Sequence, residues 1–150
     1  MFGPSTTAAY ATRALVFLAN RPDRMSGARE LSSRTGVPRP YLVKILHTLS
    51  DKGFVVARRG CRGGYRLGRP PGAITLFEIV AAVDGIVAFE RCLLGPGNCS
   101  AKRGCPLHSL WSRQRQRVKK RFRALSLSEL VHFKMFDIEN GSDRVERALG

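Results

Sequence analysis

Apolar residues near the start of the chain recur at the three- and four-residue spacing of an amphipathic helix. The first such run extends over 6–20, and Pro22 ends it. Ser26 is a good N-cap for a second, shorter helix, which Gly36 terminates. The pattern therefore predicts two successive helices with a short proline-containing connection between them.

A third helix is predicted directly afterwards, in "VPRPYLVKILHTLSDKG" (37–53). Pro38 and Pro40 fit there because both lie in the first turn, where a helix needs no amide donor. Two short helices joined by a glycine-containing turn indicate a helix-turn-helix. The apolar face of the third helix is formed by Leu42, Ile45, Leu46 and Leu49.

The segment after the third helix, "FVVARRGCRGGYRLGRPP" (54–71), is typical of two short strands around an arginine- and glycine-rich tip. Pro70 and Pro71 close this hairpin. Three helices followed by a hairpin are the order of a winged helix. We therefore expect a mostly α fold with a small β-hairpin wing, that is, a winged helix-turn-helix DNA-binding domain.

Apolar periodicity continues in the second half of the chain. A fourth helix is expected in 73–86, and a long helix is expected from Cys105 to Leu125. A capping box over 126–129 opens one more short helix. The long helix repeats its less polar positions along a narrow seam, which suits pairing with a partner helix. The seam consists of Leu107, Trp111, Val118 and Leu125 and is interrupted by the polar Gln114.

Charge indicates the kind of partner. The 150 residues hold 26 Lys+Arg against 11 Asp+Glu, a net charge of +15, which favours nucleic acid first and an anionic membrane second. No run approaches the roughly 20 apolar residues of a membrane span, and the apolar run after Arg13 is too short and too late for a secretory signal. We expect a cytoplasmic protein that binds no membrane.

The outward face of the third helix carries no acid before Asp51, so it can approach phosphate without repulsion. A plain three-helix structural domain is the alternative, but motif, charge and wing together favour DNA readout. Arginines on the wing suit phosphates or a narrow minor groove. For the basic run 91–128, a solvated face and phosphate binding stay equally open. The candidate DNA contacts are Arg39, Pro40, Val43, Lys44, Arg58, Arg59 and Arg62.

Three of the four cysteines and one histidine lie in a single glycine-rich loop, spaced C-x6-C-x5-C-x2-H. Cys105 and His108 are three positions apart at the predicted start of the long helix, so both can face one point. Cytoplasmic thiols stay reduced, which argues against a disulfide. Thiolates with an imidazole are suitable ligands for an iron-sulfur cluster or zinc, and we favour such a site over accidental clustering of the four residues. Basic neighbours are expected to lower the thiol pKa values. The candidate ligands are Cys92, Cys99, Cys105 and His108, and the basic neighbours are Arg91, Lys102 and Arg103.

These observations predict three regions. A winged helix-turn-helix DNA-binding domain occupies 1–72, a cluster-binding loop with dimerisation helices occupies 73–135, and a polar tail occupies 136–150. No glycine-rich phosphate loop, nucleophile elbow or pair of carboxylates at helical spacing is present, so we expect no enzyme. A basic RNA-binding module would need exposed aromatics for unstacked bases, which the pattern does not predict.

The chain resembles the Rrf2 family of bacterial winged-helix regulators up to about Phe133. The resemblance rests on "AAYATRALVFLA", "PRPYLVKILHTLSDKGFV", "RRGCRGGYRLGRPP" and the three cysteines ahead of "PLHSLW". It implies a homodimer, joined through the long helix, that binds a partly palindromic operator in double-stranded DNA. Operator affinity or sequence preference would then change with the state of a cluster, so that the regulator senses redox state, nitric oxide or iron-sulfur status.

The resemblance also assigns the ligands by motif match. The three cysteines fall on the cluster thiolates, and His108 falls on the imidazole ligand of IscR-like members, which implies a 2Fe-2S cluster, with 4Fe-4S or zinc as alternatives. NsrR-like members use an acid just before the first-helix tyrosine, where this chain has Ala8 and Ala9. Cys61 on the wing departs from the family pattern, as do Pro38, Pro40 and Val43 on the recognition helix. A regulator with structural zinc or no metal, responding to another signal, is the alternative.

Overall fold

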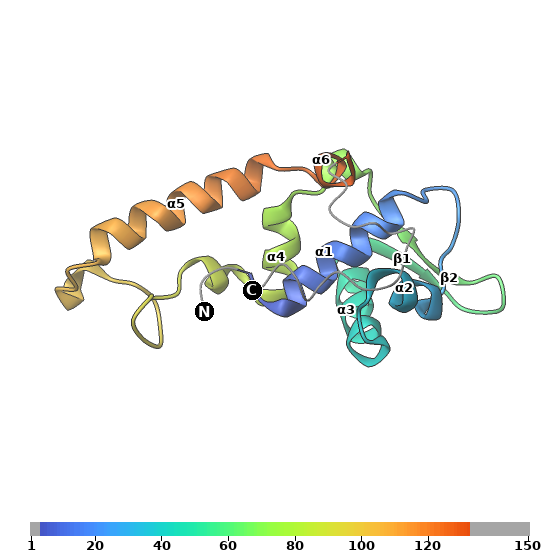
Figure 1. The fold of residues 1–150 in the computed structure, drawn as a ribbon, viewed down its shortest axis with the longest axis horizontal. Coiled ribbons are helices and arrows are strands. Elements are labelled where there is room, and N and C mark those ends of the chain that lie inside the picture. Colours follow the sequence, from blue (N-terminus) through green and yellow to red (C-terminus); the bar gives the residue numbers. More distant parts are fainter. Residues whose placement is uncertain (1–3, 133–150) are drawn as a thin grey trace.

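A computed structural model describes residues 4–132 and shows a helical body from which one long helix extends (Figure 1). The central helix α1 contacts every other helix of the body. None of the described helices is both long and apolar enough to span a bilayer. In chain order the helices and strands are α1 (Thr6–Ala19), α2 (Ala28–Thr35), α3 (Arg39–Asp51), β1 (Val55–Arg58), β2 (Gly64–Leu67), α4 (Leu76–Asp84), α5 (His108–Ala124) and α6 (Leu127–His132).

The three predicted N-terminal helices and their core are confirmed. Ser5 caps α1 by accepting a hydrogen bond from the Ala8 amide at 3.1 Å. Gly36 ends α2 in the left-handed conformation, with φ of 69°, which glycine adopts without a steric penalty. All four side chains predicted for the inner face of α3 are buried, and they pack with Leu15, Leu18 and Leu31 in one cluster.

The predicted N-cap of α2 is wrong. Gly27 occupies the N-cap position, and Ser26 is instead completely buried as a β-bridge partner of Tyr65. Two backbone hydrogen bonds join Ser26 and Tyr65, each 2.9 Å long. A serine at the cap would satisfy one helix amide, whereas the bridge satisfies two backbone groups and holds the α1–α2 connection against the wing.

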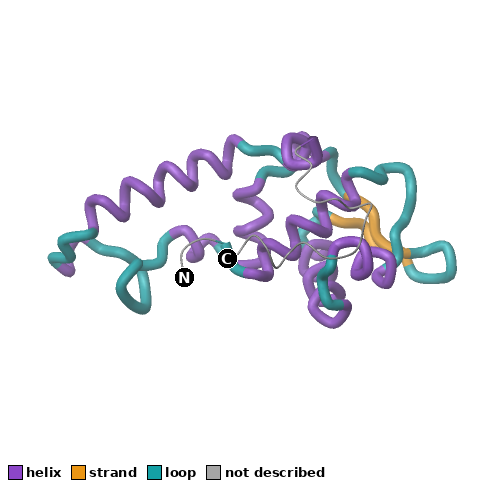
Figure 2. The backbone as a smooth tube through the Cα atoms, in the orientation of Figure 1, coloured by secondary structure: helices purple, strands orange, loops and turns teal. Residues whose placement is uncertain are grey.

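The wing is the expected two-stranded antiparallel hairpin, with Val55 opposite Leu67 and Arg58 opposite Gly64 (Figure 2). Its tip turns through Gly60, whose φ is 102°. A Cβ atom on Gly63 would lie 2.1 Å from the Arg58 carbonyl oxygen. The tip therefore needs glycine there because its backbone folds directly onto β1.

Residues after the wing join the same core. Ile74, Ile79, Leu127 and Leu130 are buried in one cluster with the side chains of α1 and α3. Thr75 opens α4 with a full capping box, and the box predicted at Ser126 caps α6. The boundary drawn at residue 72 stays a prediction. The tail predicted for 136–150 lies outside the described residues.

The long helix α5 leaves the body, as Figures 1 and 2 show. The sequence had predicted that this helix begins at Cys105, but it begins at His108. Cys105 therefore lies in the turn before the helix. None of its 17 residues is buried. Trp111 and Val118 of the predicted seam line a groove of about 270 Å³ against the chain's own Phe89, while Leu107 is partly exposed to solvent.

Candidate nucleic-acid interface and metal centre

The outward face of α3 has the composition that the sequence predicted. Arg39, Pro40 and Lys44 are exposed, and Val43 is 41% exposed. Tyr41, which is not among the predicted DNA contacts, is 63% exposed at the start of the same helix. The helical periodicity could have identified it, because Tyr41 is not part of the buried apolar set of this helix.

Near the other end of this face a carboxylate restrains a histidine. The Nδ1 of His47 lies 3.1 Å from the Asp51 carboxylate, and both side chains are mostly exposed. The basic N-terminal half of α3 is therefore the part suited to approach the DNA backbone, since a carboxylate repels phosphate.

The wing arginines lie at the end of the molecule opposite the cysteine loop (Figure 1). Arg58, Arg59 and Arg62 are all exposed around the tip. Cys61 is an exposed free thiol among them. The tip therefore presents a compact positive group on a tight glycine turn, a form that suits insertion beside a phosphate backbone or into a narrow groove.

The cysteine loop begins with a small closed turn. Cys92 donates its amide to the Gly97 carbonyl at 3.0 Å, and Cys99 donates its amide to the Glu90 carbonyl at 3.1 Å. Gly97 allows this closure with φ of 92°. The two cysteines at the ends of the turn are thereby brought together, although six residues separate them.

Two of the four predicted ligands, Cys99 and His108, are in contact where α5 begins. The Sγ of Cys99 lies 3.1 Å from the Nδ1 of His108. Cys92 and Cys105 lie near enough to Cys99 to raise its pKa. Across the described residues, no three His, Cys, Asp or Glu side chains are already arranged around one ion position.

The sequence predicted lowered thiol pKa values, and for Cys99 this is wrong. Burial raises the pKa of Cys99, the nearby Arg115 partly opposes that effect, and Cys92 and Cys105 raise it further. The cation that acts on Cys99 is therefore Arg115 of α5, rather than the loop cations adjacent in sequence. A neutral thiol must release its proton to solvent before it can ligate a metal, so metal binding at Cys99 would be accompanied by proton release.

Helix α5 holds the segment that leads into the cysteines through three side chains at four-residue spacing. Trp111 donates its indole N–H to the Arg91 carbonyl at 3.0 Å, and Arg115 donates to the Phe89 carbonyl at 3.4 Å. Lys119 pairs with Glu90 at 3.1 Å. Arg115 and Lys119 belong to the basic run predicted from the sequence, and their four-residue spacing places them on one face of α5.

The same segment is connected to the body by aromatic contacts. Phe89 stacks on Phe77 of α4 with ring centroids 4.8 Å apart, and meets Phe122 of α5 edge to face at 5.8 Å. Arg123 lies over the Phe77 ring at 4.5 Å. The cysteine loop, α4 and α5 therefore form one packed unit beside the winged helix.

Comparison with known proteins identifies the family of this chain. The profile of the Rrf2 family, described as an iron-dependent transcriptional regulator, matches residues 4–133. An HTH-type transcriptional regulator of Aquifex aeolicus (strain VF5) is 33% identical over 85% of this chain and 90% of its own length. The HTH-type transcriptional regulator IscR of Xenorhabdus nematophila is 34% identical over 79% of this chain and 72% of its own length.

The fold matches a solved structure as well. The structure of CymR (YrzC), the global cysteine regulator of B. subtilis, superposes with a TM-score of 0.73 and 26% identity. The match covers 89% of this chain and 98% of that chain.

Proposed function

The chain belongs to the Rrf2 family of transcription regulators, and on that premise we propose that it is a cytoplasmic homodimer that senses through an iron-sulfur centre. Rrf2 regulators bind DNA and are not enzymes. The finer proposal concerns what this member detects. We propose that the centre is bound by Cys92, Cys99, Cys105 and His108. The signal would be redox state, nitric oxide or the iron-sulfur status of the cell.

One observation carries this proposal. The Sγ of Cys99 and the Nδ1 of His108 are 3.1 Å apart, with two more thiols beside them. Three thiols with one imidazole match a thiolate- and imidazole-ligated iron-sulfur centre. The motif resemblance to IscR-like members leads us to propose 2Fe-2S, with 4Fe-4S as the alternative. When bound, such a centre supplies reversible one-electron chemistry and a site that oxidants can attack.

The chain's own residues would transmit the state of that centre. Trp111, Arg115 and Lys119 bind the segment 89–91, so ordering the cysteine turn also orders the first half of α5. Phe89 contacts α4 through Phe77. A two-state change in this unit would alter how the two winged helices of a dimer are set relative to each other.

On the DNA side, we propose that the basic start of α3 contacts bases and phosphates in the major groove. The residues are Arg39, Pro40, Val43 and Lys44, and Arg58, Arg59 and Arg62 of the wing bind phosphate or the minor groove beside them. Their exposure supports this assignment, as does the lack of an acid on the first turns of α3.

A structural zinc site is the second candidate, because thiolates and imidazole also suit zinc. Four single variants, Cys92→Ala, Cys99→Ala, Cys105→Ala and His108→Ala, separate the candidates when purified without oxygen. We expect iron, sulfide and visible absorption in the wild type and their loss in each variant. Cys61→Ala is the matched control and should keep both. Zinc alone in iron-replete wild type, or full iron and sulfide in the cysteine variants, would contradict the proposal.

A further inference from the structure

Arg69 follows the wing two residues after β2 and contacts two different parts of the body. Its two terminal nitrogens, Nη1 and Nη2, donate to the Oε1 atom of Glu78 at 3.3 and 3.2 Å. Its guanidinium carbon lies 4.6 Å from the centroid of the Phe54 ring. One side chain therefore joins the base of the wing to the first turn of α4 and to the residue that links α3 with β1.

Phe54 is held firmly within the winged helix. Its side chain is buried, and its amide donates to the Leu49 carbonyl at 2.9 Å. Its own carbonyl accepts a hydrogen bond from the Gly68 amide at 2.8 Å. Leu49 belongs to the buried face of α3, so Phe54 connects the end of the recognition helix to both strands of the hairpin. Since Arg69 directly follows Gly68, it contacts Phe54 where the angle between α3 and the wing is set.

Glu78 binds Arg69 with the same carboxylate that caps α4. Its Oε2 atom accepts hydrogen bonds from the Thr75 amide at 2.9 Å and from the Thr75 hydroxyl at 3.0 Å, which leaves Oε1 for Arg69. The side chains of Arg69 and Glu78 are 36% and 38% exposed, so solvent screens this ion pair only in part. A shift or rotation of the first turn of α4 therefore moves the acceptor that Arg69 depends on.

The residue before Glu78 contacts the segment that leads into the cysteines. Phe77 stacks on Phe89 with ring centroids 4.8 Å apart. Phe89 directly precedes Glu90, whose carbonyl accepts the Cys99 amide at 3.1 Å. Consecutive helical residues project about 100° apart. The first turn of α4 therefore touches the cysteine side of the molecule through one residue and the base of the wing through the next.

We propose that Arg69 is the positioning residue through which α4 transmits the state of the cysteine loop to the wing. The inference rests on the proposed function and adds to it a residue that lies outside both proposed sites. Within the described residues, the Nε atom of Arg69 is buried without a hydrogen-bond partner. Because a buried unpaired donor is costly, a movement of Glu78 that pairs Nε gives the guanidinium a second arrangement.

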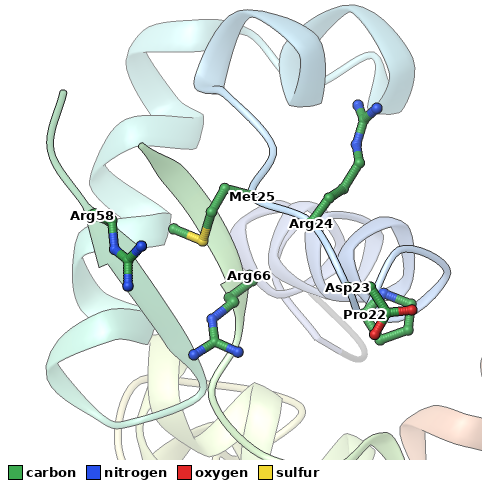
Figure 3. Close-up of a pocket in the computed structure, with 6 residues that line it drawn as sticks. All are labelled: Pro22, Asp23, Arg24, Met25, Arg58 and Arg66. Carbon is green, nitrogen blue, oxygen red and sulfur yellow. The ribbon is translucent and has the colours of Figure 1, made fainter. Parts of the chain in front are cut away.

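The wing would respond to such a change along its whole length. Its strands pair from Val55 opposite Leu67 at the base to Arg58 opposite Gly64 near the tip. Figure 3 shows that Arg58 and Arg66 project from this hairpin into the space beside the α1–α2 connection. A small tilt at the base displaces these side chains relative to α3, and the recognition helix and the wing then fit one DNA duplex less well together.

The test measures coupling, defined as the ratio of the DNA affinities of the cluster-loaded and the cluster-free protein. Two duplexes of equal length and base composition are used, one enriched by the wild-type protein from a random pool and one scrambled. With the enriched duplex the wild type should give a ratio of roughly tenfold or more, whereas Arg69→Ala should give less than about twofold with both duplexes. Arg69→Lys keeps the charge but not the planar fork, and should recover part of the ratio.

Hydrogen exchange, followed by mass spectrometry, reports on the wing in the absence of DNA. Amides in the hairpin 54–69 should exchange at different rates in the loaded and the cluster-free wild type, and at equal rates in the two forms of Arg69→Ala. Iron and sulfide per chain should be the same in this variant as in the wild type, because the proposed role is to transmit the state of the loop and not to hold the centre. Should Arg69→Ala fail to fold, Arg69→Gln keeps a hydrogen-bond donor without the charge, and the same results are expected of it.

Arg21→Ala is the matched control. It removes an arginine whose guanidinium lies 4.2 Å from the centroid of the Phe17 ring, a contact local to the end of α1, and it should keep the wild-type ratio. A wild-type ratio in both Arg69 variants would overturn the inference and leave the proposed function standing. An equal loss of the ratio in Arg21→Ala, or a loss of iron and sulfide in Arg69→Ala, would also overturn it. If the two forms of the wild type bind the enriched duplex equally, the proposed function fails and this inference fails with it.

Discussion

At the scale of single residues, the two proposed sites depend on close contacts between residues that are distant in sequence. Cys99 and His108 meet because the turn that ends at Cys99 closes back on Glu90. At the opposite end of the molecule, Gly63 lets the wing tip fold against Arg58. Both contacts fix where a reactive or charged group is presented, and neither contributes much buried apolar surface.

The wing tip gives a residue-scale prediction. Gly63→Ala places a Cβ atom 2.1 Å from the Arg58 carbonyl oxygen, and because that atom is backbone the turn itself must move. We expect weaker DNA binding with little change in the melting temperature of the core. Gly72→Ala is the control, since its nearest neighbour would be the Ser128 hydroxyl at 3.9 Å. Equal DNA affinity of the two variants in fluorescence anisotropy would show that the tip does not contact DNA.

At the scale of elements, the capping box of α4 links charge to folding. Burial alone would raise the pKa of Glu78, but hydrogen bonds from the Thr75 amide and hydroxyl and from Arg69 outweigh it and hold that pKa below its ordinary value. A carboxylate with a lowered folded-state pKa stabilises the fold above its ordinary pKa, and this contribution is lost as pH falls through the folded-state pKa.

Two variants test the box. Thr75→Ala should lower the free energy of unfolding by about 1 kcal/mol near neutral pH. Glu78→Gln should also be less stable than the wild type at neutral pH, with a difference that shrinks as the solution is acidified below the ordinary carboxyl range. Denaturant titrations at several pH values measure both effects. A Glu78→Gln difference that stays constant across that range would contradict the assigned role of the carboxylate.

How far the sequence predicts each element depends on whether its interactions are local. The face of α3 follows from apolar periodicity, and all four predicted side chains are buried. The cap at Ser26 was predicted wrongly because its partner, Tyr65, lies in the wing. The loop ligands were predicted from their chemistry, whereas the raised pKa of Cys99 and the contact with Arg115 arise only when α5 packs on the loop.

At the scale of the whole molecule, α5 is the part that the single chain leaves most exposed. None of its residues is buried, and Leu110 is 51% exposed. We predict that this helix pairs with its copy, so that the exposed apolar positions are covered. Sedimentation at micromolar concentration should show a dimer, and Leu110→Glu should shift it towards monomer. A stable wild-type monomer would contradict the prediction.

Sensing requires that the cysteine loop influence a DNA surface at the far end of the molecule (Figure 1). The described contacts offer a route, since the segment 89–91 is bonded to α5 and stacked on α4, which packs on α1. The core of the winged helix is continuous without any contribution from the cysteines. The centre should therefore affect how DNA is bound and leave the folding of the core unchanged.

The most direct test is the affinity for one enriched duplex, measured without oxygen by fluorescence anisotropy at constant salt, for the cluster-loaded protein and for the same sample after the cluster is removed. We predict at least a tenfold difference in affinity, about 1.4 kcal/mol, between two forms that have the same far-ultraviolet circular dichroism. Equal affinities of the loaded and cluster-free forms for both the enriched and the scrambled duplex would contradict the account.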